Sequence, residues 1–191
     1  MTATEKLHRQ RGLSLIELIL FIVVVSAALA GVLQVFIQAG SASADPQAQR
    51  QAVAIAESLM QEVQLMPFTF CDPDDANVET ATSSAIGAAG CASLAEAIGP
   101  EAGETRFATP QFDNVNDYHG YVMTNGLVDI NNTAITGLEA YSASITVATA
   151  SLGSIPASGD ALLITVTVTA PHGVQVVLAG YRTRYAPNAA L

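Results

Sequence analysis

The sequence predicts an α+β fold: a long N-terminal helix, membrane-spanning in its first half and kinked near residue 45, packed on an antiparallel sheet of about four strands. Two patterns in the 191 residues predict it. Residues 18–37 form an apolar run with no charged residue and no proline. After residue 117 the apolar residues recur at every second position, the period of a half-buried strand. Half of all residues are hydrophobic, so the chain can bury one moderate core, and its length favours a single domain.

The apolar run is long enough to cross a membrane. A helix of this length rises ~30 Å at ~1.5 Å per residue, which matches the hydrocarbon layer of a bilayer. The basic residues Lys6, Arg9 and Arg11 all precede the run. Such residues stay in the cytoplasm, so the rest of the chain is expected on the other side. We therefore expect a single-pass inner-membrane protein with a cytoplasmic N-terminus and a periplasmic body.

A second helical segment is expected after the apolar run. Gly40 to Ala44 loosen the apolar pattern, and Asp45-Pro46 is typical of an N-cap followed by a first-turn proline. The sequence therefore predicts a break or kink here, then a helix over 46–66 that ends before Pro67. An apolar stripe at helical spacing marks its core-facing side. The stripe residues are Ala52, Ala56, Leu59, Val63 and Met66. A coiled-coil partner site is the alternative, but two heptads are fewer than such sites need.

Residues 67–117 are predicted to form a long loop region with one short helix over 92–98. Gly, Ala, Ser, Thr, Pro and acidic residues dominate the region, and its only cysteines are Cys71 and Cys91. Loops of this length are uncommon in compact domains unless they are functional or tied down. Two cysteines in an oxidising periplasm are expected to pair. Closing a loop of this size contributes roughly 3 kcal/mol in the chain-entropy model.

The sheet is expected within 118–191. Apolar residues alternate with polar ones from Leu162 to Thr169, and Pro171-His172-Gly173 marks a turn into a strand over 174–185. This pattern predicts a hairpin. An earlier strand is expected around Ile145, and residues 118–124 are the candidate for a fourth.

Composition argues against two broad function classes. The formal net charge is −10, and removal of a basic leader would leave a still more acidic body, which phosphate backbones repel. We therefore expect no nucleic-acid partner. His119 and His172 are the histidines beyond the leader, and no Ser/His/Asp, Cys/His or phosphate-binding motif accompanies them. The sequence predicts no enzyme and no cofactor, with a membrane-tethered enzyme as the alternative.

Two groups of oxygen-bearing side chains raise the question of calcium. The first group comprises Asp72, Asp74, Asp75 and Asn77, and the second comprises Asp113, Asn114, Asn116 and Asp117. Neither group has the spacing, glycine and distal glutamate of an EF-hand. Solvated loop carboxylates and Asx turns are the favoured interpretation, so the sequence predicts no metal site.

The N-terminal motif carries the functional interpretation. A basic leader is followed by Gly12-Leu13-Ser14-Leu15-Ile16-Glu17 and then by the apolar run. This order resembles the signature of type IV prepilins. The resemblance implies cleavage by a prepilin peptidase between Gly12 and Leu13, methylation of the Leu13 amine and a role for Glu17 in assembly. Many members have phenylalanine where this chain has Leu13. The implied organisation is a leader over 1–12, a membrane and filament-core helix over 13–40 and a periplasmic pilin-like domain over 41–191.

Glu17 has a physical role in that setting. A carboxylate inside a bilayer segment is costly, and cleavage creates a cationic amine that could pair with it. Two unit charges about 4 Å apart attract by about 4 kcal/mol at an effective dielectric constant near 20. The resemblance implies that Glu17 of one subunit pairs with the Leu13 amine of another and sets the axial register. Pairing within one chain, one helical turn apart, is the alternative.

An ordinary secretory signal peptide is the competing interpretation of the N-terminus. Ala42-Ser43-Ala44 before Asp45 fits the small-residue rule for signal peptidase. The apolar segment, however, is much longer than the usual 7 to 15 residues and contains Glu17. We therefore favour the prepilin interpretation.

Further segments resemble minor pilins of the MSHA pilus, the MshD family. They are Asp45-Pro46, 54–57, 70–74, 112–120 and 180–185. The resemblance implies a structural minor pilin whose partners are other pilin subunits, the prepilin peptidase, the pilus assembly platform and the inner membrane, with the filament at the cell surface as its destination. A type II secretion pseudopilin and a tip-located, adhesin-like binding module around Cys71 and Cys91 are the alternatives.

Overall fold

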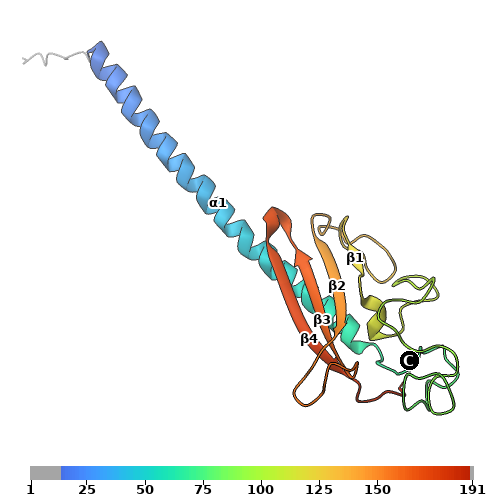
Figure 1. Cartoon of the computed structure of the whole chain (residues 1–191). Coiled ribbons are helices and arrows are strands. Elements are labelled where there is room, and N and C mark those ends of the chain that lie inside the picture. The colour runs from blue at the N-terminus through green and yellow to red at the C-terminus, as the bar shows by residue number, and fades with distance from the viewer. Residues whose placement is uncertain (1–13, 190–191) are drawn as a thin grey trace, which may run out of the picture. The chain divides into compact units, whose positions relative to one another are not determined.

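The computed structural model describes residues 14–189, with the side chains of 38–45 outside the description. One helix, α1, extends over Leu15–Leu65. The chain divides into two compact units, one ending at Ala44 and the other beginning at Asp45. The second unit contains the C-terminal part of α1 and all strands, as predicted for an α+β fold (Figure 1).

The predicted helix break at Asp45-Pro46 is wrong, because α1 continues through both residues and Pro46 lies inside it. A proline removes one backbone donor and crowds the preceding turn, but a helix that is supported on both sides can continue past it. The kink near residue 45 stays a prediction, since the two units are described separately.

Four antiparallel strands form one sheet in the order β1-β2-β3-β4. Their bounds are Val122–Met123, Ser142–Thr149, Ala161–Thr169 and Gln175–Thr183. The predicted hairpin is confirmed: η2, Pro171–Gly173, joins β3 to β4, with His172 and Gly173 at φ values of 62° and 77°. β1 is shorter than the predicted strand over 118–124: the 3₁₀ helix η1, Val115–Tyr118, covers the first residue of that range, and only Val122 and Met123 pair with β2.

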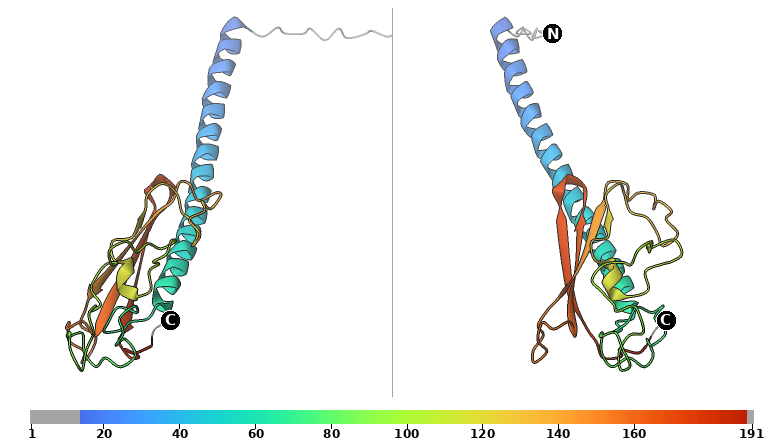
Figure 2. Two further views of the ribbon diagram at one scale, coloured as in Figure 1. Left: turned by 90° about the vertical axis from the view of Figure 1, so that its right-hand side faces the viewer. Right: turned by 45° about the vertical axis from the view of Figure 1, so that its right-hand side comes forward.

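The core lies between the sheet and the second half of α1, which form two layers (Figure 2). Ala52, Ala56, Leu59 and Val63 of the predicted stripe are buried and Met66 is half-buried. They share one cluster with the inward residues of β2 and β3, which are Ala143, Ile145, Val147, Leu162, Ile164, Val166 and Val168. The stripe is therefore a core face and not a coiled-coil site.

Gly180 explains how closely β4 approaches α1. A Cβ at Gly180 would lie 2.8 Å from Gln64 Nε2 and 3.1 Å from Met60 Sδ. Those distances leave no room for a side chain unless the two helix residues move.

The region after α1 is irregular, as predicted, but the short helix over 92–98 is wrong. Phe70 to Asp72 instead lie beside Leu94 to Glu96: the Asp72 N–H donates to the Leu94 carbonyl at 3.3 Å, and the Glu96 N–H donates to the Phe70 carbonyl at 3.1 Å. These backbone groups are used in extended pairing, so they are not available to a helix. The loops gather at one end of the sheet, near the C-terminal residues (Figures 1 and 2), and Asn188 Nδ2 donates to the carbonyls of Val78 and Ala81.

Candidate functional site

The first unit is an apolar helix with its side chains exposed. Leu15–Ile37 comprises 23 residues with a mean hydropathy of 2.7, and none of the most apolar window is buried. Leu15, Phe36 and Ile37 are each more than 70% exposed. By length and composition this helix can cross a membrane. An apolar surface of this extent needs a lipid or protein environment to cover it.

Glu17 lies in the first turn of that helix. The N–H groups of Glu17 and Leu18 both donate to the Ser14 carbonyl, at 3.0 and 3.1 Å. Ser14 and Glu17 have the spacing of a capping box, and a carboxylate near a helix N-terminus interacts favourably with the helix dipole. Gly12 and Leu13 lie outside the described residues, so cleavage, methylation and the pairing of Glu17 with an amine stay predictions.

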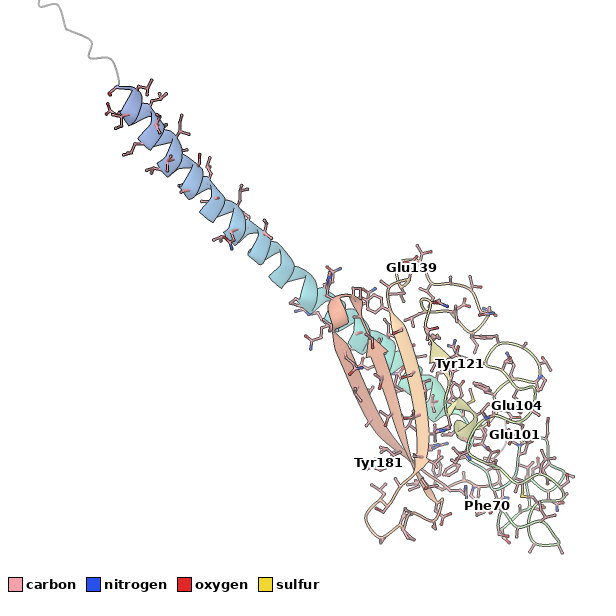
Figure 3. The ribbon with its side chains drawn as sticks, turned by 45° about the horizontal axis from the view of Figure 1, so that its top comes forward. Phe70, Glu101, Glu104, Tyr121, Glu139 and Tyr181 are labelled. Carbon is pink, nitrogen blue, oxygen red and sulfur yellow. A yellow bond between two sulfur atoms is a disulfide. The ribbon has the colours of Figure 1, made fainter. Side chains whose placement is uncertain are left out.

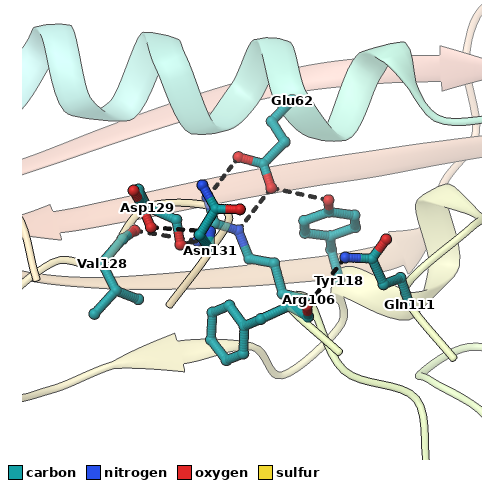
Figure 4. Close-up of polar contacts among 8 residues, drawn as sticks. Glu62, Arg106, Gln111, Tyr118, Val128, Asp129 and Asn131 are labelled. Carbon is teal, nitrogen blue, oxygen red and sulfur yellow. Dashed lines mark hydrogen bonds and ion pairs between the residues drawn. The ribbon is translucent and has the colours of Figure 1, made fainter. Parts of the chain in front are cut away.

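A buried ion pair ties α1 to the loop region (Figure 4). Arg106 Nε and Nη2 donate to the two carboxylate oxygens of Glu62, both at 2.7 Å. Tyr118 donates its hydroxyl to Glu62 Oε1 at 2.9 Å, and Arg106 Nη1 donates to the carbonyls of Val128 and Asp129 at 3.2 Å. The Arg106 side chain is 5% exposed and that of Glu62 22%. One carboxylate on α1 thus organises two loops, an arrangement that the sequence analysis did not find.

The predicted disulfide joins Cys71 to Cys91, with their Cα atoms 5.4 Å apart. Both cysteines are fully buried with Val78 and Ala81 in a small cluster of their own. Asp75 lies within the loop that they close and binds it to the residues that follow Cys91.

Asp75 accepts four backbone hydrogen bonds. The N–H groups of Ala92, Ser93 and Leu94 donate to it at 2.8 Å, and that of Asn77 at 2.9 Å. These hydrogen bonds, that of Leu94 foremost, lower the pKa of the Asp75 carboxyl below its usual range. Asp75 is thus a structural carboxylate, and its oxygens are already engaged.

Seven other carboxylates gather beside η1. They form three overlapping groups, and within each group one oxygen per residue lies within 4.8 Å of the others. The groups are Asp72, Asp74 and Asp113; Asp72, Glu96 and Glu101; and Glu101, Glu104 and Asp117. We call these seven residues the carboxylate cluster. Figure 3 places Glu101 and Glu104 close to η1, which carries Asp117.

Burial and mutual repulsion oppose ionisation of the cluster. Burial, together with the charge of Asp117 and its neighbours, raises the pKa of Glu96 to about 9. Burial raises the pKa of Asp113 to about 7 and that of Asp117 to about 6. Asp72 and Asp75 are 2% and 3% exposed and Asp117 is fully buried, so the expectation of solvated loop carboxylates is wrong for these three. The Asx turns are confirmed at Asp72 and Asp75, each of which accepts an N–H two residues on.

A cavity of about 430 Å³ lies between α1 and the loop after β1. Ile55, Leu59, Leu127 and Leu138 contribute to its walls, and Glu62 and Arg106 are also among its lining residues. Its lining suits an apolar side chain.

Comparisons with protein-family models, with curated proteins and with solved structures find no match for this chain.

Proposed function

We propose that this chain is a minor pilin-like subunit of a type IV filament of the MSHA type. It is held in the inner membrane by its N-terminal helix and assembles through that helix after a prepilin peptidase removes residues 1–12. The observation that carries the proposal is the exposed apolar helix Leu15–Ile37 with one carboxylate, Glu17, in its first turn.

The helix supports the proposal because its surface suits two environments in succession. Its leucine, isoleucine, valine and phenylalanine side chains are exposed in the single chain. Lipid covers them in the membrane, and the same helix of neighbouring subunits can cover them in a filament core. Transfer between the two environments exchanges one apolar contact for another, so it requires no exposure of this surface to water.

The second unit is compatible with export. Its disulfide is suited to an oxidising periplasm. A two-layer body with its core on the C-terminal part of α1 leaves Leu15–Ile37 for lipid or for other subunits. The partners of this proposal are the peptidase, the assembly platform and other pilin subunits.

The first test concerns processing. Mass spectrometry of the mature protein is expected to find a methylated Leu13 at its N-terminus. Asp45 as the first residue would reject the proposal in favour of signal-peptidase cleavage.

The second test concerns Glu17. Glu17→Gln removes the charge but keeps the hydrogen-bonding groups and the size of the side chain, whereas Glu17→Ala removes both. If Glu17 pairs with an amine of a neighbouring subunit, both variants are cleaved and inserted but incorporate poorly into filaments. If its role is to cap the helix, Glu17→Gln incorporates like the wild type. The measurement is the amount of subunit in sheared filaments relative to the membrane fraction, with processing checked for each variant.

Expression beside an MSHA pilus system and beside a type II secretion system distinguishes the two filament classes. We expect co-purification with pilus filaments. Incorporation into a secretion pseudopilus alone would support the pseudopilin alternative.

A further inference from the structure

The carboxylate cluster is assembled from three separate stretches of the loop region. Asp72 and Asp74 follow the first cysteine, Glu96 to Glu104 follow the second, and Asp113 and Asp117 flank the start of η1. Backbone hydrogen bonds hold the stretches together: 70–72 pairs with 94–96, and the Gly99 N–H donates to the Asn116 carbonyl at 3.1 Å. The carboxylates are therefore brought together by the fold, despite the repulsion between them.

Asp117 shows that the cluster is more than an acidic surface. Its Oδ2 accepts the N–H groups of Asp113 and Asn114 at 2.9 and 2.7 Å. Its Oδ1 has no hydrogen-bond partner among residues 14–189. The residue is fully buried and belongs to the group with Glu101 and Glu104. A buried carboxylate oxygen without a partner is costly. A cation between Asp117, Glu101 and Glu104 would satisfy it.

Other buried oxygens surround the same place. Oδ1 of Asp113, both carboxylate oxygens of Glu96 and Oε2 of Glu101 also have no hydrogen-bond partner within the described chain. Arg184 interacts with the charge of Glu96, but it also pairs with Asp160 at 3.5 Å. Its guanidinium lies over the rings of Phe68 and Phe70, 4.2 and 4.5 Å from their centroids. One guanidinium does not balance seven carboxylates.

The ligand chemistry selects the cation. All three groups consist of carboxylates alone. This disfavours zinc, which prefers histidine and thiolate ligands. Oxygens on one calcium ion, at about 2.3–2.6 Å from it, can lie up to about 5 Å apart, whereas Mg²⁺ at about 2.1 Å requires a tighter octahedron. The loops that carry these carboxylates are irregular, which fits the larger ion with its more adaptable coordination geometry.

We propose that the carboxylate cluster contains a calcium-binding centre, in which Glu101, Glu104 and Asp117 are the ligands of the ion and Asp117 contributes its buried Oδ1. The ion would link the stretch after the second cysteine to η1. This inference is independent of the proposed filament function, because it concerns only the second unit.

Calorimetric titration of the full chain tests the proposal directly. The detergent-solubilised protein is stripped with a chelator, dialysed and titrated with CaCl₂, and in parallel with MgCl₂. We expect saturable calcium binding and an increase in the Tm of the body with calcium concentration. No calcium binding, or magnesium binding of equal strength, would overturn the proposal.

Three variants assign the binding to the cluster. Glu101→Gln and Asp117→Asn each remove one charge from the cluster, and Glu79→Gln removes one from an exposed position in the same loop region. We expect each cluster variant to weaken calcium binding by roughly tenfold or more, because calcium affinity follows the charge count of the ligands. Glu79→Gln is expected to bind like the wild type. Equal weakening in all three variants would mean a diffuse charge effect and would overturn the proposal.

A stability readout separates calcium ligation from a structural role. In chelator, Glu101→Gln is expected to unfold at the wild-type Tm or higher, because one repelling carboxylate is neutralised. In calcium, its Tm is expected to rise much less than that of the wild type. If Glu101→Gln loses the same stability with and without calcium and still binds calcium, the assignment of Glu101 as a ligand is overturned.

Discussion

The ion pair between Glu62 and Arg106 predicts a large loss of stability when one partner is removed. Arg106→Met keeps most of the aliphatic volume and removes the guanidinium. Among the described residues, Glu62 then keeps only the hydroxyl of Tyr118 as a partner (Figure 4). The carbonyls of Val128 and Asp129 both lose the guanidinium, and that of Asp129 keeps the N–H of Asn132 at 3.1 Å.

The size of the loss follows from burial. Removing one partner of a buried ion pair costs about 3–5 kcal/mol, because the other charge is left without compensation. Since 22% of the Glu62 side chain is exposed, water can solvate part of the carboxylate, and we expect the lower end, about 3 kcal/mol. For a domain of this size each kcal/mol shifts Tm by about 2–4 °C, so Tm is expected to fall by roughly 6–12 °C.

Near-UV circular dichroism during thermal unfolding measures this effect, because the chain has no tryptophan and Tyr118 is buried beside the pair. Arg50→Met is the matched control, since Arg50 is exposed on the same helix. The double variant Arg106→Met with Glu62→Met is expected to lose less stability than the sum of the losses in the two single variants.

A small effect would refute the reasoning. If Arg106→Met costs less than about 1 kcal/mol, the pair contributes no more than a surface salt bridge, and the loops are held by other contacts. Equal losses for Arg106→Met and Arg50→Met would lead to the same conclusion.

Two further predictions concern the loop region. Replacing Cys71 and Cys91 together by alanine is expected to destabilise the body by roughly 3 kcal/mol, measured by urea unfolding of oxidised wild type and variant. An unchanged unfolding midpoint would mean that Asp75 and its backbone hydrogen bonds hold the loop without the disulfide. In chelator, the folded chain keeps a proton on Glu96 that the unfolded chain releases, because the pKa is raised from 4.5 to about 9. The stability of the wild type relative to Glu96→Gln is therefore expected to fall as pH rises from 4.5 to about 9, and a difference in Tm that does not depend on pH would contradict it.

Periodic features of the sequence were sufficient to predict the helix and the main strands. The apolar run to Ile37, the stripe from Ala52 to Val63 and the alternation in β3 all depend on neighbours within a few residues. Burial of one helix face or one strand face follows directly from such spacing. The disulfide was also predictable, because the chain has two cysteines and an expected exported body.

The tertiary structure alone decided the loop region and what it holds. Glu62 and Arg106 are 44 residues apart in sequence, and no local pattern links them. The expected helix over 92–98 is absent because the Leu94 carbonyl and the Glu96 N–H pair with Asp72 and Phe70, far away in sequence. The seven carboxylates likewise come from three stretches whose spacing resembles no known loop motif. Hydrogen bonds between distant segments fix an irregular loop, and periodicity carries no information about such partners.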